Sequence, residues 1–206
     1  YSLPVLILIT FVISSCQKKE TEQPLFKLLP SSQTNIHFVN KLSDEDAPGI
    51  LKYLYFYNGG GVAVGDINND GLPDIYFTSN KKGGNKLYLN KGNYQFEDIT
   101  GKAGVAGTAD WCTGVAMADV NNDGYLDIYV CAVAGKLDLK GHNLLYINNH
   151  DGTFTERSAE YGLDFSGYST QAAFFDYNHD GKLDCFLLNQ SNHSVETYGD
   201  TSLRRN

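Results

Sequence analysis

The sequence is short of residues that several large protein classes need. It has one Met, one Trp and five Pro among 206 residues, while 14 Tyr and 21 Gly favour a β protein with many tight turns. It lacks a basic stretch with interleaved aromatics, so nucleic acid is not an expected partner. It also lacks a nucleophile elbow, a His-Glu-x-x-His motif and a phosphate loop. No catalytic residue is therefore predicted, and an enzyme is not expected.

Long hydrophobic runs are also missing, because residues 3–13 fall well short of the about 20 residues that span a bilayer. Their length suits the hydrophobic region of a signal peptide. The run ends at Ser15-Cys16 before polar residues, which resembles a bacterial lipoprotein signal in which the cysteine becomes acylated. The alternative is an ordinary secretory peptide with a chance cysteine. Two acyl chains on Cys16 would anchor the protein stably to a membrane.

This N-terminus sets the expected organisation and location of the chain. Residues 1–16 are interpreted as a signal peptide whose start is truncated, 17–34 as a polar linker, and 35–206 as the repeat region. A lipoprotein signal indicates the envelope of a Gram-negative bacterium, with the outer membrane or cell surface as the expected site.

Cysteine is scarce as well. Apart from Cys16, the chain has Cys112, Cys131 and Cys185, and none of them has the spacing of a metal site such as Cys-x-x-Cys. They lie in or beside apolar, strand-like runs, so they are predicted to be small buried side chains. A disulfide of Cys112 is the alternative in an oxidising compartment.

What the sequence does contain is an internal repeat. Residues 61–77, 114–130 and 171–187 align without gaps, with spacings of 53 and 57 residues. After the first two of these segments, residues 85–90 match residues 143–148. Nine of the 24 acidic residues lie in the repeated loops, which leaves 15 against 16 Lys and Arg. The net charge of −8 is therefore concentrated where cations are expected to bind.

Each repeat reads as four short strands joined by Gly and Asn turns. The first two strands are apolar at nearly every position, so both of their faces must be covered. Radial stacking of four-stranded sheets meets this need, and the fold prediction is an all-β propeller; a β-solenoid is the competitor. Propellers close with about four to eight blades, whereas about three are present here. The ring is expected to be incomplete, and the chain to be an N-terminal fragment that stops in mid-blade near residues 203–206.

The loops have the form Asp-x-Asn-x-Asp-Gly-x-x-Asp, which supplies oxygen at positions 1, 3, 5 and 9 and a backbone carbonyl at position 7. Calcium takes about six to eight oxygen ligands, so one ion per loop and three in total are predicted. The predicted ligands are Asp66, Asn68, Asp70, Leu72 and Asp74; Asp119, Asn121, Asp123, Tyr125 and Asp127; and Asp176, Asn178, Asp180, Lys182 and Asp184.

The alternative to calcium is a plain hairpin turn that uses Asn, Asp and Gly for backbone reasons. That reading accounts for positions 3 to 6 but leaves an aspartate at position 9 inside an apolar strand, where an unpaired carboxylate is costly. An EF-hand is excluded, because its position 12 needs a Glu and the chain has Phe77, Val130 and Leu187 there.

The loops, their spacing and the flanking strands resemble FG-GAP (VCBS) repeats, which form the seven-bladed propeller of integrin α subunits. The run 57–66, with residues 87–90 and 96–98, is similar to bacterial lipoproteins of the ASPIC/UnbV (CRTAC1-like) type. The literal Phe-Gly and Gly-Ala-Pro signature is absent. The resemblance implies a propeller with calcium loops at one end of the blades and ligand-binding loops at the other.

The function expected from these observations is a calcium-binding, lipid-anchored scaffold for adhesion to a glycan or protein. Eight residues before the first Asp of each loop stand Asn58, Trp111 and Tyr168. The two aromatic residues are candidates for the ligand face, and packing between blades is the alternative. Two further functions stay open: the non-catalytic propeller of a larger polysaccharide-processing enzyme, and a calcium-dependent structural spacer.

Overall fold

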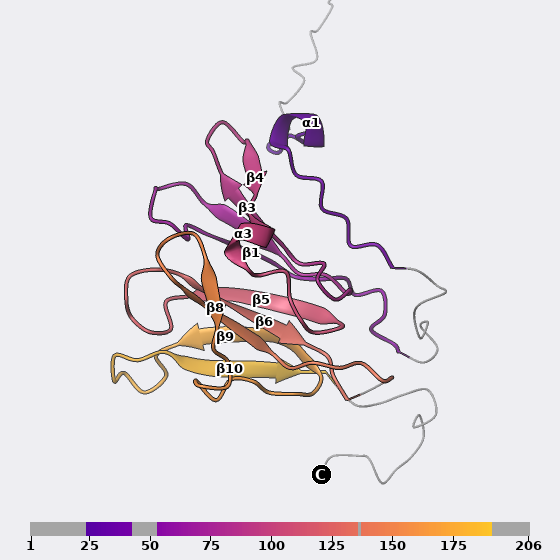
Figure 1. The fold of residues 1–206 in the computed structure, drawn as a ribbon, viewed down its shortest axis with the longest axis vertical. Coiled ribbons are helices and arrows are strands. Elements are labelled where there is room, and N and C mark those ends of the chain that lie inside the picture. The colour runs from indigo at the N-terminus through magenta and orange to yellow at the C-terminus, as the bar shows by residue number, and fades with distance from the viewer. Residues whose placement is uncertain (1–23, 43–52, 136, 191–206) are drawn as a thin grey trace, which may run out of the picture.

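The structure, a computed structural model, describes residues 24–42, 53–135 and 137–190 (Figure 1). The expected signal peptide, the expected lipidation site Cys16 and residues 203–206 lie outside the described residues. In chain order the elements are α1 (Ser31–Thr34), β1 (Val62–Gly65), β2 (Asp74–Phe77), β3 (Lys86–Asn90), β4 (Phe96–Asp98), α3 (Thr100–Ala103), β5 (Cys112–Ala118), β6 (Asp127–Ala132), β7 (Leu144–Asn148), β8 (Phe154–Glu156), β9 (Ser169–Phe175) and β10 (Asp184–Asn189).

The strands form three separate antiparallel sheets, which are the blades predicted from the repeat. The first blade has the order β1-β2-β3-β4, the second β5-β6-β7-β8, and the third pairs β9 with β10. The sheets stack side by side, with β5 between β1 and β9 (Figure 1). The all-β prediction is confirmed, and the described blades do not close into a ring.

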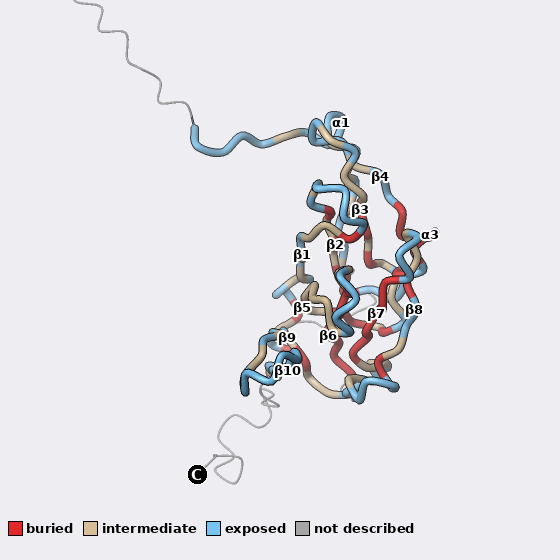
Figure 2. Tube along the Cα trace, turned by 90° about the vertical axis from the view of Figure 1, so that its left-hand side faces the viewer, coloured by how far each residue is buried: buried red, intermediate tan, exposed pale blue. Residues whose placement is uncertain are grey.

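Burial follows from the stacking of these sheets. Every residue of β6 and β7 in the second blade is buried, because a sheet covers each face. In β1 the pattern alternates, so Val62 and Val64 are exposed while Ala63 faces the second blade. In β10, Phe186 and Leu188 are exposed in the same way. Figure 2 shows the buried segments gathered in β6 and β7, with exposed chain at β9 and β10.

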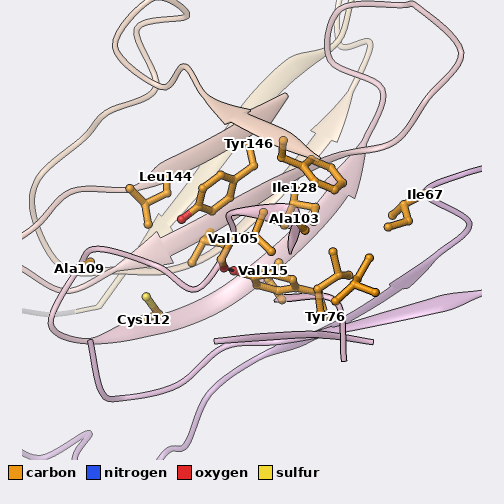
Figure 3. Packing of buried hydrophobic residues seen from close by; sticks show 14 of the residues in the cluster. Ile67, Tyr76, Ala103, Val105, Ala109, Cys112, Val115, Ile128, Leu144 and Tyr146 are labelled. Atoms are coloured by element: carbon orange, nitrogen blue, oxygen red, sulfur yellow. Dashed lines mark hydrogen bonds between the residues drawn. The ribbon is translucent and has the colours of Figure 1, made fainter. Parts of the chain in front are cut away.

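The largest hydrophobic cluster lies between the first and second blades (Figure 3). Tyr76 of β2 is fully buried there, and its hydroxyl donates a 2.6 Å hydrogen bond to the carbonyl of Val105. From the second blade, Val115 and Ile128 pack into the same cluster. Burial of this apolar area is the main force that holds the two sheets together.

In each of the first two blades, a buried asparagine just before the third strand forms hydrogen bonds within its own blade. Asn85 donates to the Tyr76 hydroxyl at 3.1 Å, and Asn143 donates to the Tyr129 hydroxyl at 2.9 Å. Each amide oxygen also accepts a backbone N–H at 2.8 Å. In the third blade Phe186 stands at the tyrosine's place in the repeat and has no hydroxyl to take part.

The segment before the repeats covers part of the first blade's outer face. Phe38 stacks on Phe77 with 4.8 Å between ring centroids and 14° between planes. The Asn40 side-chain amide donates to the Asn80 amide oxygen at 2.7 Å. These contacts place residues 35–42 against the blade, although the first strand begins only at Val62.

Candidate calcium loops and the face opposite them

The three candidate loops are the hairpin turns that join the first two strands of each blade. In the first blade, Gly65 at the end of β1 pairs with Asp74 at the start of β2, so the loop closes directly on the sheet. Position 6 is left-handed in all three loops, with φ of 83°, 88° and 82° at Gly71, Gly124 and Gly181. Glycine adopts this conformation without the steric penalty that other residues meet, which agrees with its predicted role in the turn.

Position 4 of each loop is also left-handed, which the sequence analysis missed. Asn69, Asn122 and His179 have φ of 59°, 58° and 61°. Asn and His are among the non-glycine residues that adopt this conformation most readily. The choice of residue at position 4 was therefore a readable signal for the turn.

Side chains inside each loop hold its backbone through short hydrogen bonds. In the first loop, Asp66 accepts from the N–H of Asp70 at 3.1 Å and of Gly71 at 2.7 Å. Asp70 accepts from the N–H of Leu72 at 2.8 Å. The second and third loops repeat these bonds with nearly the same lengths. The loops are thus shaped by their own side chains, as expected of Asx turns.

The position 9 aspartates of the first two loops are buried, as the sequence predicted for residues inside a strand. The exposed fraction is 0% for Asp74 and 1% for Asp127. Each carboxylate accepts two backbone hydrogen bonds: Asp74 from Ile67 at 3.0 Å and Asn90 at 2.7 Å, and Asp127 from Val120 at 3.0 Å and Asn148 at 2.9 Å. These two donors satisfy part of each carboxylate's capacity to accept hydrogen bonds.

This pairing corrects one premise of the sequence argument. A metal is not required to explain a carboxylate at position 9, since backbone N–H groups reach it from the loop and from the third strand. Burial still raises the pKa of Asp74 above its ordinary value, against the two hydrogen bonds, and the charges of Asp70 and Asp66 add to the rise. Asp184 in the third loop differs, because it is exposed and its carboxylate accepts a hydrogen bond from the Tyr177 N–H at 2.9 Å.

The donor set of each loop fits calcium by its chemistry. Three carboxylates, one amide carbonyl and the position 7 backbone carbonyl are all hard oxygen donors, which suit calcium and not zinc. Each hydrogen-bonded carboxylate oxygen also keeps a further lone pair. Among the described residues, however, no group of three or more His, Cys, Asp or Glu side chains is arranged as a metal site. The loops still supply oxygen donors of the right chemistry for calcium.

The second loop has an additional partner, His150, in the turn between β7 and β8. Its Nε2 lies 2.9 Å from Oδ2 of Asp123, and its ring stacks on Tyr125 with 4.1 Å between centroids. The pKa of Asp123 is lowered: slight burial opposes the shift, and hydrogen bonds from His150, the Tyr125 backbone and Asn121 outweigh it. The sequence gave no sign of this contact.

The loops of the first and second blades are joined directly. The Asn69 side chain donates to the Gly124 carbonyl at 3.0 Å, from position 4 of one loop to position 6 of the next. Asn148, at the end of β7, donates to the Ile67 carbonyl of the first loop at 2.8 Å. The second blade thus supports the first loop as well as its own.

The predicted ligand-face aromatics take the alternative role at the opposite end of the blades. Trp111 is 4% exposed and packs in a cluster with Tyr53, Phe56 and Val133. Tyr168 is half-buried and packs against the same cluster. The Trp111 ring is enclosed by other aromatic rings, which favours the packing alternative for this residue.

The three described cysteines are free thiols. Cys112 and Cys131 are buried, and Cys185 is half-buried. Burial raises the pKa of Cys112 to about 11 and that of Cys131 to about 12, so both stay protonated and unreactive. The prediction of buried small side chains is confirmed for these two, and Cys112 forms no disulfide with another described cysteine.

With the fold and loops described, the family can be assigned. Stacked four-stranded sheets with an Asp-rich loop after each first strand define a propeller-type repeat protein. The sequence profile of the FG-GAP-like repeat matches residues 66–130 and 132–187. The chain belongs to the FG-GAP-like repeat family.

Two groups of relatives support this assignment. The chain is similar to cartilage acidic protein 1 of Xenopus tropicalis, with 47% identity over 80 residues that cover 39% of the chain and 12% of the relative. It is similar to integrin alpha-8 of Gallus gallus, with 30% identity over 156 residues that cover 68% of the chain and 15% of the relative. It is thus an FG-GAP repeat protein of the cartilage acidic protein 1 and integrin type, and the matches span well under a fifth of these relatives' lengths.

Among solved structures, the fold is compared with that of an Agrocybe aegerita lectin that recognises non-reducing terminal N-acetylglucosamine. The match has a TM-score of 0.36 and 22% identity, and it covers 61% of this chain and 31% of the lectin. At this level of similarity the match has no bearing on function. No helix in the described part of the chain is long and apolar enough to cross a membrane.

Proposed function

We propose that this chain is part of a calcium-stabilised adhesion scaffold of the cell envelope, anchored by lipid on Cys16 and presenting a binding face for glycan or protein. The observation that carries the proposal is the threefold repetition of one loop geometry with the same oxygen donors. The similarity to integrin alpha-8 supports the adhesive role. The proposed role is non-catalytic, because the sequence carries no nucleophile elbow, His-Glu-x-x-His motif or phosphate loop.

In this proposal calcium neutralises the loop carboxylates and fixes each hairpin. The residues that would hold it are those at positions 1, 3, 5, 7 and 9 of each loop. The chain's own hydrogen bonds already set the turn, so the ion would act on a backbone that needs little rearrangement. The direct contacts between the first two loops would pass this rigidity to the neighbouring blade.

The adhesion role is tested by capture of the purified chain on arrays of glycans and of extracellular proteins, in calcium and in EGTA. We expect capture on one class of surface in calcium and its loss in EGTA. Equal signals with and without chelator would contradict calcium dependence. The absence of capture on every surface would leave only a structural spacer and overturn the adhesion proposal.

The lipid anchor is tested separately. Metabolic labelling with an alkyne fatty acid in a Gram-negative host should modify the protein, and C16S should abolish the label. Labelling that persists in C16S, or no labelling of either form, would contradict the anchor while leaving the adhesion role unaffected.

A further inference from the structure

A cavity of about 260 Å³ opens at the end of the blades opposite the loops. All three inner strands contribute to it near their starts: Gly61 before β1, Thr113 in β5 and Gln171 in β9. Tyr53, from the segment before the first blade, and Gln190, just after β10, complete the wall. The site therefore exists only because three blades meet there.

The inner strands approach one another closely around this cavity, which gives it a fixed frame. The Gly61 N–H donates to the Thr113 carbonyl at 2.7 Å, and the Thr113 hydroxyl donates to the Ser169 carbonyl at 2.7 Å. A Cβ on Gly114 would come within 2.2 Å of the Thr170 carbonyl oxygen, so glycine is needed at this approach. These bonds hold the three strand starts in one arrangement.

The chemistry of the cavity is neutral and amphipathic. None of its lining residues carries a formal charge. The Gln190 amide donates to the Tyr53 hydroxyl at 2.7 Å, and the half-buried Tyr55 ring lies 5.9 Å from the Tyr53 ring at an angle of 59°. Asn58 adds an exposed amide at the rim. Tyrosine rings with neutral amides and hydroxyls present apolar faces beside hydrogen-bonding groups.

A second cavity shows that this neutrality is not general to the molecule. It lies beside the first loop, has a volume of about 410 Å³ and is bordered by charged side chains. These are Lys91, Glu97, Lys102, His150 (when protonated) and Asp151. The neutral cavity is therefore distinct in the ligands it can accept, because a charged group entering it would lose hydration without gaining a counter-charge.

We infer that the neutral cavity binds a single uncharged sugar ring of a glycan. This inference rests on the adhesion role proposed above and names the ligand class of its binding face. The cavity is smaller than the about 300–1,000 Å³ of pockets for drug-sized ligands, which suits one ring. The half-buried Tyr55 ring contacts the apolar face of the sugar, and the amides of Asn58 and Gln171 bond its hydroxyl groups.

The test is saturation-transfer NMR on the full chain in calcium, with methyl glycosides of neutral hexoses and N-acetylhexosamines and with methyl glucuronide as probes. We expect transfer to at least one neutral glycoside and none to the glucuronide. Y55A and N58A should each lower the affinity for the neutral glycoside by about tenfold, as loss of a central contact does. Y161A is the matched control, since Tyr161 is a partly exposed tyrosine outside the cavity wall.

Three results would overturn the sugar site: transfer to the glucuronide alone, transfer to no glycoside, or unchanged affinity in both Y55A and N58A. Thermal melts establish whether each variant is folded. If Y55A unfolds, N58A still tests the site, because it removes only an exposed side chain at the rim. Capture on arrayed proteins combined with failure of every glycoside would leave the adhesion scaffold standing. If the chain is captured on no array and binds no glycoside, both the adhesion scaffold and the sugar site are overturned.

Discussion

Single side chains in this protein connect parts of the chain that are distant in sequence. Asp127 accepts one hydrogen bond from its own loop and one from Asn148 at the end of β7, so its carboxylate ties the loop to the third strand. Asp74 does the same in the first blade. These bonds explain why an acidic residue is found at the start of a buried strand even before any ion binds.

We therefore expect D127A to destabilise the protein in EGTA as well as in calcium. The buried Asn148 N–H and the partly buried Val120 N–H lose their acceptor at about 1–3 kcal/mol each, and removal of a buried charge offsets part of this cost, which gives a net loss of about 2–4 kcal/mol. Urea unfolding in EGTA measures it, with D164N at an exposed aspartate as the control. A variant as stable as the wild type would show that these hydrogen bonds contribute little.

Trp111 gives a second test at the residue scale. Because its ring is enclosed by Tyr53 and Phe56, W111A should cost about 3–5 kcal/mol, as other large-to-small core substitutions do. N58A, at the exposed equivalent position in the first repeat, should stay within about 0.5 kcal/mol of the wild type. Denaturant titration compares the two, and a stable W111A would restore its role as a surface residue.

At this scale the sequence predicted a residue's role only where local backbone conformation determines which residue is needed. The position 6 glycines were predictable because a left-handed turn needs them. Trp111 was not, because a large aromatic side chain serves a ligand face or a core equally well. The cavity residues Tyr53 and Gln190 lie 137 positions apart, and no local pattern brings them together.

At the scale of elements, the second blade acts as the support for its neighbours. Its β6 and β7 are buried on both faces, and Asn148 at the end of β7 donates to a carbonyl in the first blade's loop. The four-strand unit was predictable from the repeat, since strands that are apolar at nearly every position must be covered on both faces. The hydrogen bonds between blades were not, because they join residues 55 and 81 positions apart.

N148A should therefore loosen the first blade although the change is in the second. Loss of the bonds to Ile67 and Leu126 leaves one buried and one partly buried carbonyl without this donor, for an expected cost of about 1–3 kcal/mol. Hydrogen exchange should show faster exchange at β1 and β2 than in the wild type. Faster exchange confined to β7 and β8 would contradict a link between the blades.

At the scale of the whole molecule, binding chemistry is divided between two ends. The acidic loops gather at one end of the blades, where their oxygen donors suit a cation, and the neutral cavity lies at the other. The outer faces of the first and third blades expose apolar side chains such as Val64 and Phe186. The all-β propeller-type fold could be predicted from the repeat, whereas which end carries the cavity could be seen only from the packed strands.

The most direct test of this account is thermal melting of the chain in about 2 mM calcium, in EGTA and in magnesium. Ligand binding stabilises the folded state by mass action, and extracellular affinities of about 10⁻⁴–10⁻³ M give about 0.6–1.8 kcal/mol for each occupied loop. We predict a calcium-dependent rise in melting temperature that EGTA reverses, that magnesium does not reproduce, and that is absent in the triple variant D66A/D119A/D176A. Superimposable melts in calcium and in EGTA would contradict it.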